Sequence, residues 1–292
     1  MTYFIAEICS NHLNNLSRCK KLIDKAKEIG CDAVKFQLFE ADKLFCKEVL
    51  NNSKDHSNIK KLQLKKKIIP ILYNYSKKRK IGFGCSVFDL ENLKFLSPYV
   101  DFFKIGSYEI LRRDLFKKII KLNKKVIFST GMASKAEIIN IIQLFKSKKF
   151  YNFSILRCVS NYPADPNNSN LKSIETLREL TKKLLNKKIK IGWSDHTRNS
   201  SVILKAILTY NAEIIEFHLD LDGKGPEYKA GHCWLPNEFK NVISITKNNK
   251  MYDGNGKLKF NKSELKERYW RSDPIDGLRP IYKIRKKFKK LK

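Results

Sequence analysis

Two histidines, His196 and His218, stand at the ends of two strand-like segments that follow one another in the chain. If these segments are adjacent parallel strands, both imidazoles reach the same edge of the sheet and can bind one divalent cation. Imidazole together with carboxylate and water suits Mn²⁺, Fe²⁺, Co²⁺ or Zn²⁺, and Glu216 could orient one of the ligands. The two histidines could equally be separate structural side chains, so their spacing does not decide whether the chain binds a metal.

Lys35 and Lys104 each interrupt an apolar segment in which a surface lysine would be out of place. Together with the hydroxyls of Ser107, Ser129 and Ser194, two ammonium groups would form a pocket for a phosphate or a carboxylate. One lysine could instead form a Schiff base with a carbonyl substrate. Alternatively, each lysine has no functional role and only packs its aliphatic chain against apolar neighbours while its ammonium group stays in water.

Three glutamates, Glu7, Glu109 and Glu227, are candidates for proton transfer or for binding sugar hydroxyls. Paired lysines would keep nearby carboxylates ionised. A single acidic residue in a loop is more commonly solvated, and residues 223–227 also fit a simple turn. Cys85 and Cys158 have no histidine partner that the sequence can assign, so we predict small buried thiols rather than nucleophiles.

These groups must be positioned by an alternation of short β-branched or aromatic segments with longer segments of helical period. The predicted strands are Tyr3–Ile8, Asp32–Gln37, Ile81–Ser86, Asp101–Ile105, Lys125–Ser129, Phe153–Cys158, Ile189–Trp193 and Glu213–His218. The predicted helices are Leu16–Ile29, Ile59–Lys78, Arg112–Lys121, Lys135–Phe145, Leu171–Leu185, Ser200–Tyr210 and Pro236 to about Thr246. Such a repeat is typical of an α/β protein with a closed (β/α)₈ TIM barrel, for which about 250 residues is the usual length.

The barrel interpretation predicts that the chemistry lies at the carboxyl ends of the strands. A doubly wound open sheet is the alternative, but it would carry a glycine-rich fingerprint after the first strand, and residues 8–12 have none. Polar groups that gather at one buried edge indicate a site, because each would be costly to bury alone. Those at the predicted strand ends are Glu7, Asn11, His12, Lys35, Gln37, Ser86, Lys104, Ser107, Glu109, Ser129, Thr130, Ser160, Asn161, Tyr162, Ser194, Asp195, His196, Glu216 and His218.

The composition changes after about Asn248. Lysine, asparagine and glycine dominate residues 247–262, a compact block at 268–280 follows, and the segment 283–292 is strongly basic. We therefore predict a barrel domain at 1–248 and a C-terminal extension with a basic tail at 249–292.

The 292 residues carry 60 Lys and Arg against 29 Asp and Glu, a net charge of +31. This charge favours polyanion binding, but the lysines are spread through nearly every segment, so we expect no nucleic-acid partner and keep a non-catalytic polyanion-binding barrel as an alternative. No segment approaches the roughly 20 apolar residues of a membrane span, and no leader pattern precedes the first strand. Seven cysteines without a C-x-x-C pair fit a reduced protein. We expect a cytoplasmic protein with no membrane partner.

Six ordered motifs resemble the sialic acid (N-acetylneuraminate) synthases, a family of enzymes that condense phosphoenolpyruvate with an amino sugar. The resemblance extends from about Phe4 to Phe239. The motifs are Ile5-Ala6-Glu7 with Asn11-His12, Asp32-Ala33-Val34-Lys35-Phe36-Gln37, Phe103-Lys104-Ile105-Gly106-Ser107 with Glu109, Ser129-Thr130-Gly131-Met132, Ser194-Asp195-His196-Thr197, and Ile215-Glu216-Phe217-His218 followed by Gly225-Pro226.

The resemblance implies a metal-dependent condensation of phosphoenolpyruvate with N-acetylmannosamine, which gives N-acetylneuraminate and phosphate. It implies a divalent metal on His196 and His218, usually Mn²⁺, with Mg²⁺ or Co²⁺ as alternatives. A synthase of the legionaminate or pseudaminate type is the nearest alternative activity. The residues implied to bind phosphoenolpyruvate are Lys35, Lys104, Ser107 and Ser194, and we predict that Ser129 and Ser160 also bind substrate. The residues implied to face the sugar are Glu7, Gln37, Glu109, Tyr162 and Glu227. The predicted catalytic residues are Glu7, Lys35, Lys104 and Glu109.

The chain departs from the family's pattern in three places. Glu227 stands where Asp is common after Gly-Pro, and an unusual segment, 228–234, follows it. Ser160 occupies a position that is Asn in some members. We also expect the chain to lack the antifreeze-like C-terminal domain, which in bacterial members offers an arginine to the sugar's acyl group in the partner subunit, and we expect Arg271 or Arg279 to replace that arginine. A homodimer is a further expectation.

Overall fold

The computed structural model describes residues 2–53 and 58–288. The chain divides into two compact units, residues 1–247 and residues 248–292. The last four residues of the predicted basic tail, 289–292, lie outside the described part.

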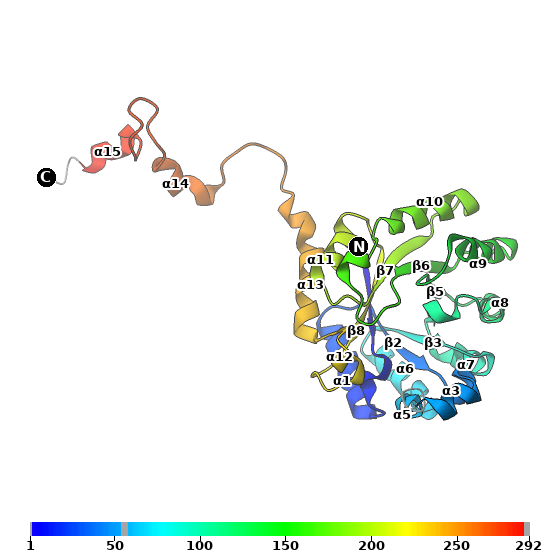
Figure 1. The fold of residues 1–292 in the computed structure, drawn as a ribbon. Helices are drawn as coiled ribbons and strands as arrows, with labels where there is room; N and C mark the ends of the chain where they lie inside the picture. The colour runs from blue at the N-terminus through cyan, green and yellow to red at the C-terminus, as the bar shows by residue number, and fades with distance from the viewer. Residues whose placement is uncertain (1, 54–57, 289–292) are drawn as a thin grey trace. The chain divides into compact units, whose positions relative to one another are not determined.

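The first unit is built on a cylinder of parallel strands. They follow one another around it in chain order, and β1 pairs with β8 to close the circle (Figure 1). The strands are β1 Tyr3–Glu7, β2 Ala33–Leu38, β3 Gly82–Val87, β4 Phe102–Ile105, β5 Val126–Ser129, β6 Phe153–Cys158, β7 Lys190–Asp195 and β8 Ile214–Leu219. The predicted (β/α)₈ barrel is confirmed, and each predicted strand is present within two residues of its expected bounds. A short additional strand, β9 Cys233–Trp234, pairs with the end of β8.

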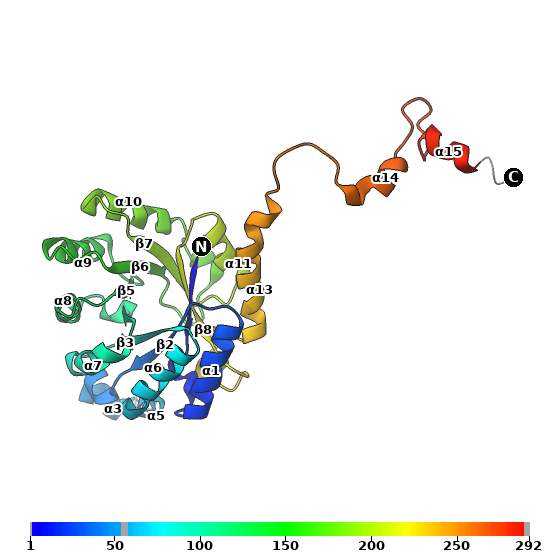
Figure 2. The same ribbon diagram turned by 180° about the vertical axis from the view of Figure 1, so that it is seen from behind.

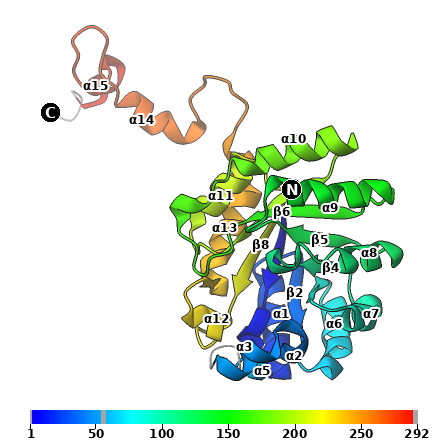
Figure 3. The same ribbon diagram turned by 45° about the vertical axis from the view of Figure 1, so that its right-hand side comes forward.

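Helices surround the cylinder on its outside, as both faces of the ribbon show (Figures 1 and 2). The longer ones are α1 Leu16–Glu28, α6 Ile69–Lys78, α7 Leu90–Leu96, α8 Arg113–Lys121, α9 Lys135–Ser147, α10 Ser173–Leu185, α11 Ser200–Leu208 and α13 Pro236–Asn248. Among the described residues, short helices in the connections are α2 Ala41–Leu44, α3 Lys47–Asn52, α5 Ile59–Leu62 and α12 Pro226–Lys229. Neighbouring helices such as α9 and α10 lie side by side (Figure 3).

Polar side chains fix where several of these helices begin. Asn15, Asp89 and Asn199 each precede a helix and accept hydrogen bonds from backbone N–H groups of its first turn. Ser134 and Glu137 form a reciprocal capping box at the start of α9. These caps satisfy N–H groups that have no partner within the helix, so each strand-to-helix loop ends at a defined residue.

The predicted single helix at Ile59–Lys78 is wrong. The chain is helical at α5 and α6, but between them Gln63 is extended and its side chain accepts a hydrogen bond from the backbone N–H of Ala41. Pro70 lies in the first turn of α6, where a missing N–H does no harm. Proline therefore marks a helix start within a stretch whose apolar period looks continuous. The sequence prediction also omitted α7.

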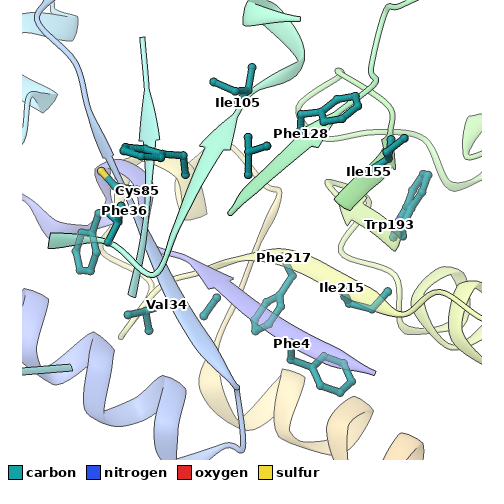
Figure 4. Packing of buried hydrophobic residues seen from close by; sticks show 14 of the residues in the cluster. Phe4, Val34, Phe36, Cys85, Ile105, Phe128, Ile155, Trp193, Ile215 and Phe217 are labelled. Atoms are coloured by element: carbon teal, nitrogen blue, oxygen red, sulfur yellow. The ribbon is translucent and has the colours of Figure 1, made fainter. Parts of the chain in front are cut away.

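The outward faces of the strands form the layer between cylinder and helices. Phe4, Phe128 and Phe217 belong to this layer, and Figure 4 shows ten of its labelled side chains on the strands. Inside the cylinder, on the side away from the carboxyl ends of the strands, the inward-facing side chains form a separate apolar plug. It consists of Ile5, Ala33, Phe102, Ile127, Leu156 and Ile214. A Cβ on Gly84 would lie 2.2 Å from the ring of Phe102, so only glycine leaves room for this ring inside the cylinder.

Side chains along a strand alternate between its two faces. The inward residues that follow the plug along β1, β2, β4 and β8 are Glu7, Lys35, Lys104 and Glu216. The same alternation of side chains that places apolar residues in the plug therefore places charged residues next to it, toward the carboxyl ends of the strands.

The second unit contains α14 Leu265–Tyr269 and α15 Tyr282–Phe288. Within it, Arg285 pairs with Asp276 at 2.5 Å, and the backbone N–H of Tyr282 donates to Asp273 at 2.6 Å. Arg271 and Arg279 are exposed, and their expected role toward the sugar stays a prediction. In the part of the chain that the structure describes, no helix has the length and apolarity needed to cross a membrane.

Arg18 on α1 ties the end of β8 to the start of the chain. Its guanidinium donates to Asp220 at 2.6 Å, to Asp222 at 2.8 and 3.0 Å, and to the backbone oxygen of Asn11 at 2.6 Å. Asp220 is fully buried. Removing one partner of a buried ion pair leaves a charge without compensation.

We predict that Arg18→Ala lowers the free energy of unfolding by about 3 kcal/mol, because Asp220 would remain buried without its guanidinium. The matched control is Lys25→Ala, which removes an exposed pair with Glu28 and should cost less than about 1 kcal/mol. Urea unfolding measures both. An Arg18→Ala variant no less stable than the control would contradict the structural role of this clamp.

Candidate active site

A cavity of about 250 Å³ opens at the carboxyl ends of the barrel strands. Except for Ser160, its walls contain every residue that the sequence assigned to catalysis, substrate binding or the metal. Five other polar residues at the predicted strand ends do not line it: Asn11, His12, Thr130, Asn161 and Asp195. The walls are formed by Glu7, Cys9, Lys35, Gln37, Ser86, Phe88, Lys104, Gly106, Ser107, Tyr108, Glu109, Ser129, Cys158, Tyr162, Ser194, His196, Glu216, His218, Glu227 and His232. The closed barrel has brought residues from all eight strand ends to one place, as such barrels do.

Glu216 lies between the two buried lysines on the cavity floor. One oxygen of its carboxylate is 3.6 Å from the ammonium group of Lys104, and the other is 4.0 Å from that of Lys35. The hydroxyl of Ser194 donates to the same carboxylate at 3.0 Å. Burial alone would raise the pKa of Glu216, but the lysines outweigh it and lower the pKa to about 2. Glu216 is therefore a permanent anion that holds both cations in place.

Each lysine has a hydroxyl partner on the next strand. Lys35 donates to Ser86 and Lys104 to Ser129, both at 2.7 Å, and Lys35 also contacts the carboxylate of Glu7. Burial lowers the pKa of Lys35 from 10.5 to about 8, although Glu216 acts in the opposite direction. The cavity therefore presents two ammonium groups to an incoming anion, one of which loses its charge at moderately alkaline pH.

Glu109 is a buried carboxyl group on the wall of the same cavity. Burial raises its pKa from 4.5 to about 7, although Lys104 acts to lower it. A carboxyl group that is about half protonated at neutral pH is suited to proton transfer.

Ser107 accepts a hydrogen bond from the backbone N–H of Gly131 at 3.0 Å. Ser160 lies beside the same glycine, where an added Cβ would be 2.2 Å from its Oγ, and this Oγ is buried and makes no hydrogen bond to any described residue. Because Ser160 does not line the cavity, its expected contact with a substrate stays a prediction.

Two of the histidines at the mouth are held so that one ring nitrogen remains available. Nδ1 of His196 lies 2.8 Å from the backbone oxygen of Val159, and Nδ1 of His218 lies 2.7 Å from Glu227 Oε2. Carbonyl and carboxylate oxygens accept hydrogen bonds, so both Nδ1 atoms carry the proton and both Nε2 atoms keep a lone pair. Burial lowers the pKa of His218 to about 4, against the effect of Glu227. The ring is therefore neutral at pH 7, as a metal ligand must be.

The residues at the mouth fit a divalent cation. The ring centroids of His196 and His218 are 5.1 Å apart, and two imidazoles that share an ion lie within about 6 Å of each other. A neighbouring set of His218, Glu227, His232 and Cys233, which shares His218 but does not include His196, offers ligand atoms that all lie within 4.8 Å of one another. Nitrogen and carboxylate donors in this arrangement suit a transition-metal ion.

Sequence reasoning missed three aspects of this site. It predicted that Glu216 orients a metal ligand, whereas in the structure the carboxylate lies between the two lysines. It left out Ser86 as a partner of Lys35, although the hydroxyl lies at a predicted strand end. It noted His232 only as part of an unusual segment, because β9 is two residues long and has no period to detect.

Comparisons with known proteins agree with this geometry. The model of the NeuB family matches residues 22–258. This chain belongs to the NeuB family. Among curated relatives, the N,N'-diacetyllegionaminic acid synthase of Campylobacter jejuni is 35% identical over 91% of this chain and 81% of its own length. The N-acetylneuraminate-9-phosphate synthase of Drosophila melanogaster is 31% identical, over 85% of this chain and 68% of its own length.

Among solved structures, the NeuB-family chain is similar to an N-acetylneuraminic acid synthetase from Leptospira borgpetersenii, crystallised in complex with citrate. The TM-score is 0.77 at 31% identity, and the match covers 91% of this chain and 90% of that one. The expected family resemblance is thus confirmed for the barrel.

We predict that the affinity of this cavity for sulfate falls about tenfold between pH 7 and pH 9, because Lys35, with a pKa of about 8, is an ammonium group below that pH and a neutral amine above it. Sulfate does not titrate in this range, so isothermal titration calorimetry reports the protein alone. Lys35→Met should bind sulfate weakly at both pH values. Lys125→Met is the matched control, because Lys125 also has a pKa lowered by burial but precedes β5 at the other end of the barrel. A pH-independent affinity in the unmodified protein would contradict the prediction.

Proposed function

We propose that this chain condenses phosphoenolpyruvate with an N-acylated amino sugar to give a nonulosonic acid and phosphate. The observation that carries the proposal is the pair of buried ammonium groups around Glu216, in the same cavity as the histidines at its mouth. The family's relatives named above, which are synthases of sialic-type acids, support the same reaction.

Phosphoenolpyruvate is the anion that we assign to the lysines. Its phosphate and carboxylate need two separated cations, and Lys35 and Lys104 supply them from neighbouring parts of the cavity floor. Hydroxyls of Ser107, Ser129 and Ser194 offer neutral hydrogen bonds beside these cations. Fixed charges in a water-poor cavity stabilise a leaving phosphate more strongly than solvent would.

The reaction forms one carbon–carbon bond, and at carbon 2 it replaces the carbon–oxygen bond to phosphate with a bond to the oxygen of water. Carbon 3 of phosphoenolpyruvate bonds to the aldehyde carbon of the open-chain sugar, whose oxygen takes a proton. Water then adds to carbon 2 and gives up one proton. The carbon–oxygen bond to phosphate breaks, the new hydroxyl gives its proton to the leaving phosphate, and the ketone remains. A divalent cation held by His196 and His218, which we propose to be Mn²⁺, would supply Lewis acidity toward the aldehyde.

The proton for the aldehyde oxygen comes, in this proposal, from Glu109. Its pKa of about 7 keeps a protonated fraction at neutral pH, and it lines the cavity that holds the lysines. Glu7, Gln37 and Tyr162 line the same wall and are assigned to the sugar. Glu227 is assigned there as well, through its Oε1, because its Oε2 accepts a hydrogen bond from His218.

N-acetylmannosamine is the sugar that we propose first, with N-acetylneuraminate as product. The precursor of legionaminate is a second candidate, favoured by the 35% identity with the synthase of Campylobacter jejuni. N-acetylmannosamine and the precursor of legionaminate differ in the groups on the sugar. In this proposal, Glu227 and the segment 228–234 contact those groups.

We expect phosphate release from phosphoenolpyruvate only when an accepted sugar and a divalent metal are both present. The assay measures inorganic phosphate with N-acetylmannosamine and with the amino-sugar precursors of legionaminate and pseudaminate, in Mn²⁺ and in excess chelator. The sugar that supports release names the substrate.

Phosphate release that continues in chelator would contradict the metal dependence. Trapping of a substrate on Lys35 or Lys104 by borohydride would favour the Schiff-base aldolase instead, since only that mechanism forms a reducible imine. Salt-sensitive binding of nucleic acid without phosphate release would favour the polyanion-binding alternative.

We predict that Glu109→Gln lowers kcat by about 10²- to 10⁴-fold, the usual contribution of a positioned acid. The KM for phosphoenolpyruvate should change less than about threefold, because the lysines remain. Glu109→Asp should recover part of the rate, and Glu179→Gln, an exposed glutamate on α10, is the control. Steady-state kinetics separates kcat from KM. A Glu109→Gln variant that loses only affinity for the sugar would assign the residue to sugar binding rather than to proton transfer.

A further inference from the structure

Three imidazoles, not two, converge at the mouth of the cavity. The ring centroid of His232 is 4.8 Å from that of His218 and 6.2 Å from that of His196. All three rings line the cavity and are buried. The distance to His218 is well within the roughly 6 Å expected of imidazoles that share an ion, and the distance to His196 is close to that limit.

The position of His232 is set by the backbone. Cys233 begins β9 and pairs in register with His218 on β8, so His232 immediately precedes a residue hydrogen-bonded to the strand that carries His218. The end of β9 is further fixed by a hydrogen bond, because the backbone N–H of Asp220 donates to the backbone oxygen of Trp234 at 2.9 Å. The third ring is therefore held by strand pairing rather than by a free loop.

One nitrogen of His232 has no partner among the described residues. Its Nδ1 is buried and makes no hydrogen bond, while its Nε2 lies 3.7 Å from Glu227 Oε2. A buried polar atom without a partner costs about 1–3 kcal/mol, so such an atom calls for a specific explanation. If the proton is on Nε2, facing the carboxylate, the lone pair of Nδ1 is available for a ligand.

Glu227 provides the charge that this arrangement needs. Its Oε2 accepts from Nδ1 of His218 at 2.7 Å and faces Nε2 of His232. A carboxylate that accepts from the outer nitrogen of a ligating imidazole fixes the tautomer and makes the inner nitrogen a better donor. A single carboxylate thus orients two of the three rings.

We propose that His232 is a third protein ligand of the divalent cation, which this chain would hold through Nε2 of His196, Nε2 of His218 and Nδ1 of His232. The inference rests on the proposed function, which requires a cation at His196 and His218. Three imidazoles leave open positions for a substrate oxygen, as catalytic metal sites require. They also favour Co²⁺, Fe²⁺ or Zn²⁺ over Mg²⁺, which prefers oxygen ligands.

The test uses Co²⁺ binding to the metal-free full chain, measured by isothermal titration calorimetry, with nitrogen ligands counted by X-ray absorption. We expect one Co²⁺ and three imidazoles in the unmodified protein. His232→Phe keeps the ring volume without a nitrogen and should weaken binding more than about tenfold, the least that even an outer partner contributes, with two imidazoles remaining. His232→Asn places a polar atom near the position of Nδ1 and should recover part of the affinity.

The control is His12→Asn. His12 is buried like His232, but its Nδ1 already accepts from the backbone N–H of Asn14 at 2.9 Å. Its replacement should change Co²⁺ affinity less than about threefold, provided that thermal unfolding of the metal-free variants shows each to be folded.

Two outcomes would overturn the inference, and they are distinguishable. If His232→Phe and His232→Asn bind Co²⁺ as tightly as the unmodified protein while His196→Ala does not, the site has two histidine ligands and the proposed function stands. If the unmodified protein binds no Co²⁺, Mn²⁺ or Zn²⁺, the metal dependence in the proposed function fails together with the third ligand.

Discussion

The pairing of β1 with β8 closes the barrel, and the site depends on this closure. It sets Glu7 directly opposite His218, although they lie at opposite ends of the barrel sequence. Parallel strands in a closed circle all end at the same mouth, so any polar residue at a strand end meets the others there. Arg18 strengthens the junction, because its guanidinium joins α1 to the two aspartates that follow β8.

Closure also creates an electrostatic problem, since charged groups enter a space from which most water is excluded. The barrel solves it by pairing each of these charges with one of opposite sign. Glu216 lies near both Lys35 and Lys104, and Glu7 also contacts Lys35. Buried charges are tolerated when each has a partner. The resulting set of cations remains available to a substrate anion because its counter-ions are side chains fixed by the strands.

At the mouth of the cavity, the hydrogen bond that one ring nitrogen of each histidine makes decides which other ring nitrogen is free to bind a metal ion. The backbone oxygen of Val159 accepts a hydrogen bond from Nδ1 of His196, and Glu227 accepts one from Nδ1 of His218. The carboxylate of Glu227 reaches both His218 and His232. Glu227 and the segment after it are thus parts of one local arrangement.

The sequence by itself determined the barrel, because strand and helix periods repeat along it, and it identified Lys35, Lys104, His196 and His218, because a polar residue in an apolar strand is visible locally. It did not identify the break before Pro70, where tertiary contacts of Gln63 overrule the helical period. Only the tertiary structure decided that Glu216 bridges the lysines and that His232 joins the other rings. Both depend on pairing between strands, and no local pattern reports which residues will face each other across a closed barrel.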